Sequence, residues 1–317
     1  MLSSAMGSID YDTLFSAHRE HLWGLCYRIT GSAADAEDLV QETFARALAK
    51  PPPDTTAPWR PWLARVATRL AIDALRRRRT RRYVGPWLPT PIETPPGIVH
   101  GQLAHPEPDA EARYGLRESI SFAFLRALEA LEPLPRATVV LRDVLGYSGP
   151  ETAQILEVSP GNVRVILHRA RAALGRYDEH RQPPSAEVDE RHQQALQRFM
   201  LAWLTGDAQQ ITACVADDVR VSSDGAGRYR AATKPILGRD NVVRFLLGLL
   251  RHTPGPPRSE LRWLNGRPGL VSVLVTAHPR DAPRSCMTLD VDRAGRLVDM
   301  HIVSAPDKLG AVAFPGP

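Results

Sequence analysis

The chain has 317 residues, a length that corresponds to about two domains at roughly 150 residues each. Forty Lys and Arg residues against 35 Asp and Glu residues give a net charge of +5, and the isoelectric point is about 9.4. That balance permits nucleic-acid binding without requiring it, and a hydrophobic content of 43% excludes wholesale disorder.

The sequence shows no signature of secretion, membrane insertion or metal binding. No apolar run approaches the roughly 18–20 residues of a membrane span, and residues 1–10 lack the basic and apolar stretches of a secretion signal. Cys26, Cys214 and Cys286 are too few and too far apart for a disulfide framework, and no Cys/His spacing suggests zinc. We therefore expect a cytoplasmic protein with no membrane partner, no metal and no cofactor.

Clustered prolines divide the chain. They interrupt any helix between Pro86 and Pro108, so residues 85–109 are expected to form an extended, semi-rigid linker. A second break falls at residues 182–185. The expected domains are therefore residues 8–84, 110–181 and 186–310.

The first segment reads as three helices. Apolar residues from Leu14 to Ile29 recur at helical spacing, and Gly31 then ends the helix. Ser32 is placed to cap a second helix, which ends at the prolines of residues 51–53. A third helix starts near Pro58, because proline is tolerated in a first turn, and it ends in an arginine run.

Residues 134–180 carry a helix-turn-helix pattern. A helix opened by Pro135 precedes a short helix at residues 151–156, and Ser159 then caps a longer helix at residues 161–174. The longer helix has an apolar back, and its front carries Asn162, Arg164, His168, Arg169 and Arg171. A helix that enters the major groove needs such long donors on its front. The ordinary alternative is a solvated basic helix in a bundle.

The third segment changes from helical to strand periodicity. A helix from Val188 to Leu204 and another from Arg239 to His252 accompany alternating stretches near residues 219–222, 261–264, 270–277, 286–291 and 297–303. Helices followed by a run of antiparallel strands predict a small α+β domain.

Two faces of the first segment go beyond a generic bundle. One is an acidic helix with the polar residues Asp35, Glu37, Asp38, Gln41 and Glu42. The other is the third helix, which presents Trp59, Trp62, Arg65, Arg69, Arg76 and Arg77. Aromatic side chains stack on unpaired bases at ~1–3 kcal/mol per base, and arginines bind phosphates. Taken singly, these features also fit a solvated acidic face, core tryptophans and a solvated helix end.

In combination they resemble the extracytoplasmic-function sigma factors of bacterial RNA polymerase. The resemblance is carried by residues 35–44 (DAEDLVQETF), by residues 62–77 and by residues 146–171, in the order and spacing of sigma regions 2 and 4. It covers about residues 8–180. It implies two all-α domains, a helical region 2 and a helix-turn-helix region 4, joined by the linker.

The resemblance also assigns partners to these residues. The acidic helix (Asp35, Glu37, Asp38, Gln41, Glu42) would dock on the clamp helices of core RNA polymerase, whose flap is a further contact. The third helix (Trp59, Trp62, Arg65, Arg69, Arg76, Arg77) would engage and open the minus-ten element of promoter DNA, and residues 50–58 would form a pocket for a flipped base. The recognition helix would read the minus-thirty-five element through Asn162, Arg164, Val165, His168, Arg169 and Arg171. Pro61 and the pair at residues 165–166 depart from the family pattern.

Residues 186–310 resemble a SnoaL-like α+β cone, on the pattern of residues 199–207, 215–219 and 236–242. A subgroup of these sigma factors carries such a domain, with a linker motif like residues 83–91 and further motifs like residues 224–228 and 306–309. The resemblance implies that the domain regulates its own sigma domains, at high effective concentration, through Trp87, Leu88, Asp224, Gly225, Gly227 and Arg228. Asp224 with Arg228 is a candidate interdomain ion contact. Alternatively, Trp87 only packs on the nearest helix and the glycine turn is only a hairpin.

The expected function is therefore an alternative sigma factor that is modulated by its own C-terminal domain and has no catalytic residues. An unidentified small ligand in the C-terminal cup is a further candidate partner. Two other functions fit the sequence. One is a helix-turn-helix regulator with a ligand-binding domain that never joins polymerase. The other is a cyclase-like or isomerase-like enzyme whose general base would be Asp217, Asp218, Asp224 or His278.

Overall fold

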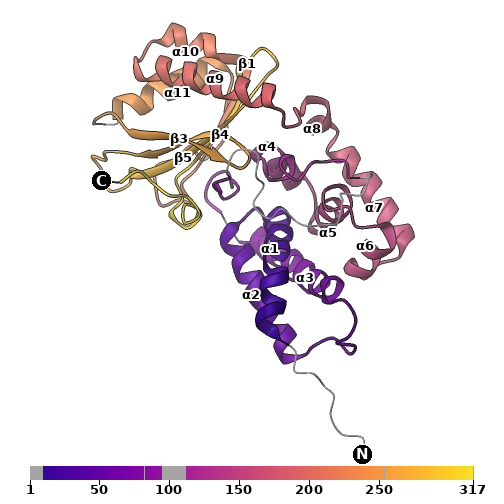
Figure 1. The fold of residues 1–317 in the computed structure, drawn as a ribbon. Helices are drawn as coiled ribbons and strands as arrows, with labels where there is room; N and C mark the ends of the chain where they lie inside the picture. The colour runs from indigo at the N-terminus through magenta and orange to yellow at the C-terminus, as the bar shows by residue number, and fades with distance from the viewer. Residues whose placement is uncertain (1–9, 82, 95–111, 253, 317) are drawn as a thin grey trace, which may run out of the picture.

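The computed structural model describes residues 10–81, 83–94, 112–252 and 254–316. Within these residues no helix is long and apolar enough to cross a membrane. A helical half leads into a sheet-containing half, which Figure 1 shows above and to the left of the helices. Part of the expected linker, residues 95–109, lies outside the described residues.

Three helices form the N-terminal bundle: α1 (Tyr11–Thr30), α2 (Ala33–Ala49) and α3 (Trp59–Thr80). Asp10 caps α1 by accepting from the Thr13 amide, and Gly31 ends it at a φ of 71°, a backbone conformation that favours glycine. Ser32 caps α2 as the sequence predicts. The apolar stripes of the three helices meet in a core that includes Leu25, Val40 and Leu63.

The middle segment is a string of short helices that ends in the predicted helix-turn-helix. In chain order they are η1 (Glu118–Ile120), α4 (Phe122–Ala127), η2 (Leu128–Ala130), α5 (Pro133–Val139), the π-helical turn η3 (Val140–Val144), α6 (Gly149–Leu156), α7 (Pro160–Ala173) and α8 (Gly175–His180). Ser148 and Glu151 form a reciprocal capping box at the start of α6, and Ser159 caps α7. Local sequence signals therefore set both helix starts.

The two helical segments share one hydrophobic core. Buried residues of α1 to α3 pack continuously with those of α4 to α7, and α3 lies against α5 and α6. His21 of α1 also contacts the Tyr147 hydroxyl at 2.8 Å across this junction. Residues 8–84 and 110–181 were expected as separate domains, but in this conformation they are packed together.

The C-terminal segment is the expected α+β domain. One sheet runs in the order β2-β1-β6-β5-β4-β3, and α9 (Ala186–Leu204), α10 (Ala208–Cys214) and α11 (Arg239–His252) cover one of its faces, as Figure 1 shows. The strands are β1 (Val215–Asp224), β2 (Ile236–Leu237), β3 (Arg258–Leu264), β4 (Arg267–Val273), β5 (Arg284–Val291) and β6 (Leu297–Val303), followed by η4 (Pro306–Lys308). The run of antiparallel strands is present as β3 to β6, and the sequence did not predict that β1 pairs with β6 in parallel. Neither β2 nor α10 was predicted, since both are short.

The uncovered face of the sheet turns toward the helical half. Leu88 of the linker and Phe122 of α4 pack there against Val271, Cys286 and Val303. Linker and helical residues thus complete a core that the C-terminal domain does not close alone. This third cluster joins the two halves of the chain.

Candidate functional site

The predicted recognition helix α7 presents an open front. Val163, Leu167 and Ala170 are buried against the other helices, which fixes the orientation of α7. Five of the six predicted minus-thirty-five residues are exposed: Asn162, Arg164, Val165, His168 and Arg169.

The sixth residue, Arg171, is differently placed. Its guanidinium pairs with the buried carboxylate of Asp143 in η3, with an Nε–Oδ2 distance of 2.9 Å. This two-point ion pair holds α7 to the preceding helix, and it also raises the pKa of Arg171. Arg171 therefore keeps a partly exposed side chain, 40% accessible, but its guanidinium is committed to Asp143 rather than pointing freely outward.

The predicted minus-ten face lies along α3. Trp59 and Trp62 are half-buried, pack edge-to-face with a centroid separation of 6.1 Å and contact the core, as the core interpretation predicts. Their stacking on unpaired bases stays a prediction. A cavity of about 370 Å³ opens beside Trp62, between α3 and the end of α2, and its basic lining is Arg46, Lys50, Arg65 and Arg69. It adjoins the loop that was expected to hold a flipped base.

The helix-turn-helix domain also contributes to the wall of this cavity. Glu157, which ends α6, forms part of the wall and lies 3.9 Å from Arg69. Both side chains are largely exposed, so this ion pair contributes little stability by itself. The ion pair shows instead that the helix-turn-helix lies beside the predicted minus-ten face of α3.

The arginine run at the end of α3 divides into two pairs. Arg76 and Arg77 are exposed. Arg78 instead donates to the carbonyl of Thr30 at 2.6 Å and to the carboxylate of Glu129 at 2.8 Å, and Arg79 donates to a backbone carbonyl beyond η2. The first pair thus lies on the exposed surface, where Arg76 pairs with Asp73, while the second pair joins the N-terminal bundle to the middle segment.

Glu129 is the centre of that junction. The buried Arg136 also donates to its carboxylate, so one anion serves two guanidinium groups. Burial opposes ionisation of Glu129, but Arg136 and Arg78 hold its pKa below the usual value. The junction therefore depends on an ionised carboxylate.

The predicted polymerase-docking face of α2 is accessible. Asp38, Gln41 and Glu42 are exposed, and Leu48 on the same helix is 58% exposed. Asp35 and Glu37 are half-buried. The five residues lie on one helix in the chain order that the resemblance implies.

Trp87 and Leu88 of the linker are placed between domains. The Arg78 guanidinium stacks 3.7 Å from the centroid of Trp87, and the Lys308 ammonium lies 4.2 Å from it. A side chain at Gly31 would approach the Trp87 ring to 2.8 Å, so this glycine is required for the close contact. Leu88 is fully buried in the third core cluster.

Asp224 ties the linker to the C-terminal domain. Its buried carboxylate accepts from the Tyr83 hydroxyl at 2.6 Å, from the Leu88 amide at 2.9 Å and from the Lys308 ammonium at 2.7 Å. Lys308 donates in turn to the Leu88 carbonyl at 2.6 Å. Burial lowers the pKa of Lys308, and Asp224 opposes that effect.

The residues next to Asp224 differ in role. Arg228 is exposed, and the ion partner of Asp224 is Lys308, so the candidate Asp224–Arg228 contact is wrong. Gly227 has a φ of 71°, and a side chain there would come within 3.0 Å of Val84 in the linker. At Gly225 a side chain would meet the Tyr229 carbonyl at 2.8 Å. The glycine turn is thus shaped both by its own fold and by contact with the linker.

The sequence interpretation missed Asn265. It stands at the β3–β4 turn with a φ of 53°, followed by Gly266 at 74°, the backbone of a tight hairpin that Asn-Gly favours. Its amide nitrogen donates to the Tyr27 hydroxyl at 2.6 Å and to the Ile120 carbonyl at 2.7 Å, and its amide oxygen accepts from Ile92. One side chain therefore bonds region 2, region 4 and the linker. The Asn-Gly pair could have predicted the turn, though not where it docks.

The candidate catalytic residues do not come together. Asp217, Asp218 and His278 are exposed, and Asp217 pairs with Arg239, while Asp224 is committed to the linker. Among the described residues no group of three metal-ligating side chains could hold a metal ion. The helix-covered side of the sheet is filled by apolar residues such as Phe199 and Met300.

Comparison with known proteins agrees with this architecture. The family model of Sigma-70 region 2 matches residues 14–81, and that of Sigma-70 region 4 matches residues 121–174. The ECF RNA polymerase sigma factor SigJ of Mycobacterium tuberculosis is 34% identical over 304 residues, which cover 93% of this chain and 91% of the relative. The probable ECF sigma factor SigI of the same species is 28% identical over 298 residues, or 92% of each chain.

A solved structure extends the similarity to the whole fold. The crystal structure of Mycobacterium tuberculosis SigJ superposes with a TM-score of 0.72 at 29% identity, covering 96% of this chain and all of that one. The chain belongs to the extracytoplasmic-function family of RNA polymerase sigma factors. It is an alternative sigma factor for transcription initiation, whose region 2 and region 4 domains imply binding to core RNA polymerase and promoter DNA.

Proposed function

We propose that this sigma factor uses the exposed faces described above and that its C-terminal domain controls them in cis. Arg164 and its exposed neighbours on α7 are assigned to the minus-thirty-five element. The Trp62 cavity and the exposed arginines of α3 are assigned to the minus-ten element, and the outer face of α2 to the polymerase clamp helices. Their support is the exposure of each face on an otherwise packed helix.

The observation that carries control in cis is the closed packing of the two sigma domains. The two promoter elements lie about 25 base pairs apart, roughly 85 Å of duplex at ~3.4 Å per base pair. In the structure α6 of region 4 packs directly on α3 of region 2. Two domains in contact cannot occupy sites at that separation, so transcription requires the sigma domains to part.

The C-terminal domain is placed to oppose that separation. Asn265 bonds both sigma domains at once, and Asp224 with Lys308 fixes the linker that connects them. In addition, η4 contacts α2, the helix assigned to polymerase docking. We infer that this set of contacts holds the free protein closed, and that core polymerase binds the open form.

Energy transfer between two labels tests this conclusion. Ala17 on α1 and Ala173 on α7 are both exposed, so cysteines there can carry donor and acceptor, with Cys214 replaced by serine. The expected result is high transfer in the free protein and low transfer in a transcribing complex reconstituted with core polymerase and a promoter library. Transcription with high transfer retained would refute the opening step. Failure to bind core polymerase would refute the assignment of the docking face.

A further inference from the structure

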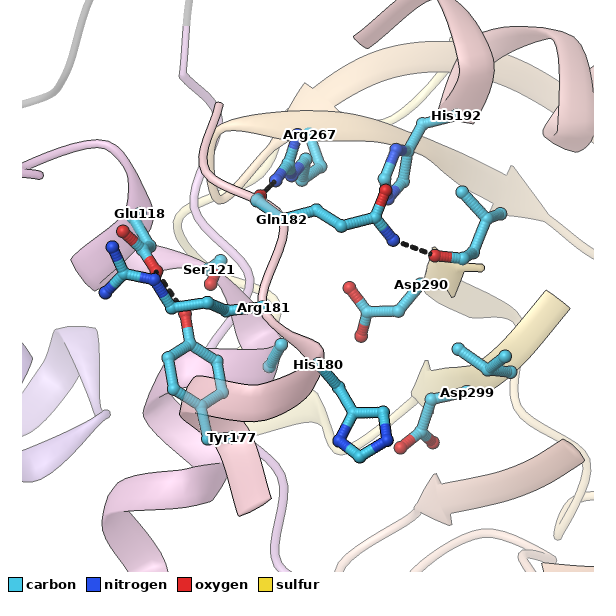
Figure 2. Close-up of a pocket in the computed structure, with 13 residues that line it drawn as sticks. Glu118, Ser121, Tyr177, His180, Arg181, Gln182, His192, Arg267, Asp290 and Asp299 are labelled. Atoms are coloured by element: carbon cyan, nitrogen blue, oxygen red, sulfur yellow. Dashed lines mark hydrogen bonds and ion pairs between the residues drawn. The ribbon is translucent and has the colours of Figure 1, made fainter. Parts of the chain in front are cut away.

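A cavity lies at the seam between region 4 and the C-terminal sheet. Its volume is about 170 Å³, comparable to a small organic molecule, and Figure 2 shows its walls. One wall comes from the helical half, with Glu118 and Tyr177. The opposite wall comes from the C-terminal domain, with His192, Arg267, Asp290 and Asp299.

Asp290 is the unusual side chain in this cavity. It stands directly opposite Asp299 in the β5–β6 ladder, and like charges facing each other across strands are destabilising. Asp299 is compensated by Arg220 and Arg126. Asp290 has no hydrogen bond or ion pair to any described residue, and Figure 2 shows its carboxylate directed into the space between His180 and Gln182.

The charges around Asp290 do not compensate it. Burial and Asp299 raise the pKa of Asp290 to about 6, and three nearby guanidinium groups oppose this without restoring the usual value. Those groups are Arg267 from β4, Arg126 from α4 and Arg220 from β1. The other titratable groups that line the cavity are Glu118, Tyr177, His180, Arg181 and His192.

The cavity contains hydrogen-bond acceptors that receive no donor from the described residues. The Nδ1 of His192 lies 2.8 Å from the Val188 carbonyl and must donate to it, and burial lowers the pKa of this imidazole to about 4. Its Nε2 is therefore an acceptor at neutral pH. Arg267 directs both of its terminal nitrogens elsewhere, one to Asp189 and the other to the Gln182 carbonyl. What is missing is a donor that carries positive charge.

We propose that this cavity binds a small organic cation, a primary ammonium or an amidinium, with its head group on Asp290. Such a group neutralises Asp290 and supplies several N–H donors to acceptors that have no partner among the described residues. A metal ion fits less well, because no described cluster offers three metal ligands. Because the two walls belong to different halves of the chain, the bound cation also stabilises the seam.

Three probes of similar size test the proposal on the full chain: n-propylammonium, n-propanol and propionate. The expected result is that n-propylammonium alone raises the melting temperature at pH 7.5, in proportion to the logarithm of its concentration. Asp290→Asn, which keeps the shape of the side chain, abolishes the shift. Asp218→Asn, at an exposed carboxylate on β1, retains it.

Calorimetry gives a second, independent readout. Because the cation binds the ionised carboxylate, its affinity is constant above about pH 7 and falls toward tenfold per pH unit below pH 6. An equal shift from n-propanol, a shift retained in Asp290→Asn, or an affinity that does not change with pH would overturn the proposal. So would the absence of any shift in the wild-type protein. None of these measurements needs polymerase, so they are independent of the proposed control in cis.

Discussion

Replacing Asp224 with asparagine should open the closed conformation. The substitution keeps the size of the side chain but removes the charge that faces the buried Lys308 ammonium. Asp224 and Lys308 both belong to the C-terminal domain, so their ion pair acts on the closed state through the linker groups that it holds, the Tyr83 hydroxyl and the Leu88 amide and carbonyl. A hydrogen bond to a charged group contributes about 1.5–3 kcal/mol. Losing the equivalent of one such bond, about 1.5 kcal/mol, lowers the population of the closed state roughly tenfold relative to the open state.

The assay is energy transfer between labels on α1 and α7, measured together with transcription from a cognate promoter. Asp224→Asn should lower transfer in the free protein and raise affinity for core polymerase. Asp217→Asn is the matched control, because its carboxylate is 81% exposed on the same strand. Unchanged transfer and unchanged core affinity in Asp224→Asn would refute the reasoning.

A double-mutant cycle separates the ion pair from a general loss of stability. Lys308→Met removes the cation while keeping an apolar stem against Trp87. If the two groups act as a pair, the double variant Asp224→Asn/Lys308→Met should be less open than the sum of the single variants predicts. Strict additivity would show that Asp224 acts through its hydrogen bonds to the linker instead.

Four further outcomes follow from the structure. Arg164→Ala should weaken promoter binding by roughly 1–3 kcal/mol and relax base preference at one minus-thirty-five position, measured by gel shift on a promoter library. Unchanged selectivity would show that Arg164 does not contact a base. Asp38→Arg should weaken core binding without changing the melting temperature, and normal assembly would contradict the docking face. Asn265→Ala should cost about 1–3 kcal/mol of unfolding free energy by leaving buried partners unsatisfied, and a denaturant titration that shows no loss would contradict this. Since its folded pKa is raised, Asp290 destabilises the fold above pH 6, so Asp290→Asn should gain about 2–3 kcal/mol at pH 7.5 and nothing near pH 3.

The parts of the fold that the sequence predicted are those set by local chemistry. Gly31 ends α1, Ser159 caps α7, and both act within a few residues of their own position. The face of α7 follows from a 3.6-residue period, so its exposed residues could be named in advance. For Arg171 the sequence did not reveal the ion pair, because its partner Asp143 belongs to another helix.

What the sequence could not predict depends on contacts distant along the chain. Asn265 bonds Tyr27 across 238 positions, and Lys308 bonds the Leu88 carbonyl across 220. No local period encodes such a pairing, and in the sequence a lone lysine reads as a solvated surface residue. The unpartnered Asp290 was missed for the same reason, because the alternating pattern of β5 does not reveal that Asp299 of β6 stands opposite it.

The contacts between the domains combine a shared apolar core with specific polar pairs. A partner shifts an equilibrium only by its differential affinity for the two states, so polymerase binding must offset the apolar surface that opening exposes. The polar pairs, Glu129 with Arg78 and the amide of Asn265 with Tyr27 and Ile120, carry much of the specificity of the closed form. Water and new partners can satisfy these groups once they separate, which is typical of domain interfaces that move. The end of α3 contributes to both surfaces: Arg76 is exposed to solvent, while Arg78, two residues further on, bonds Glu129 across the junction that holds the closed form.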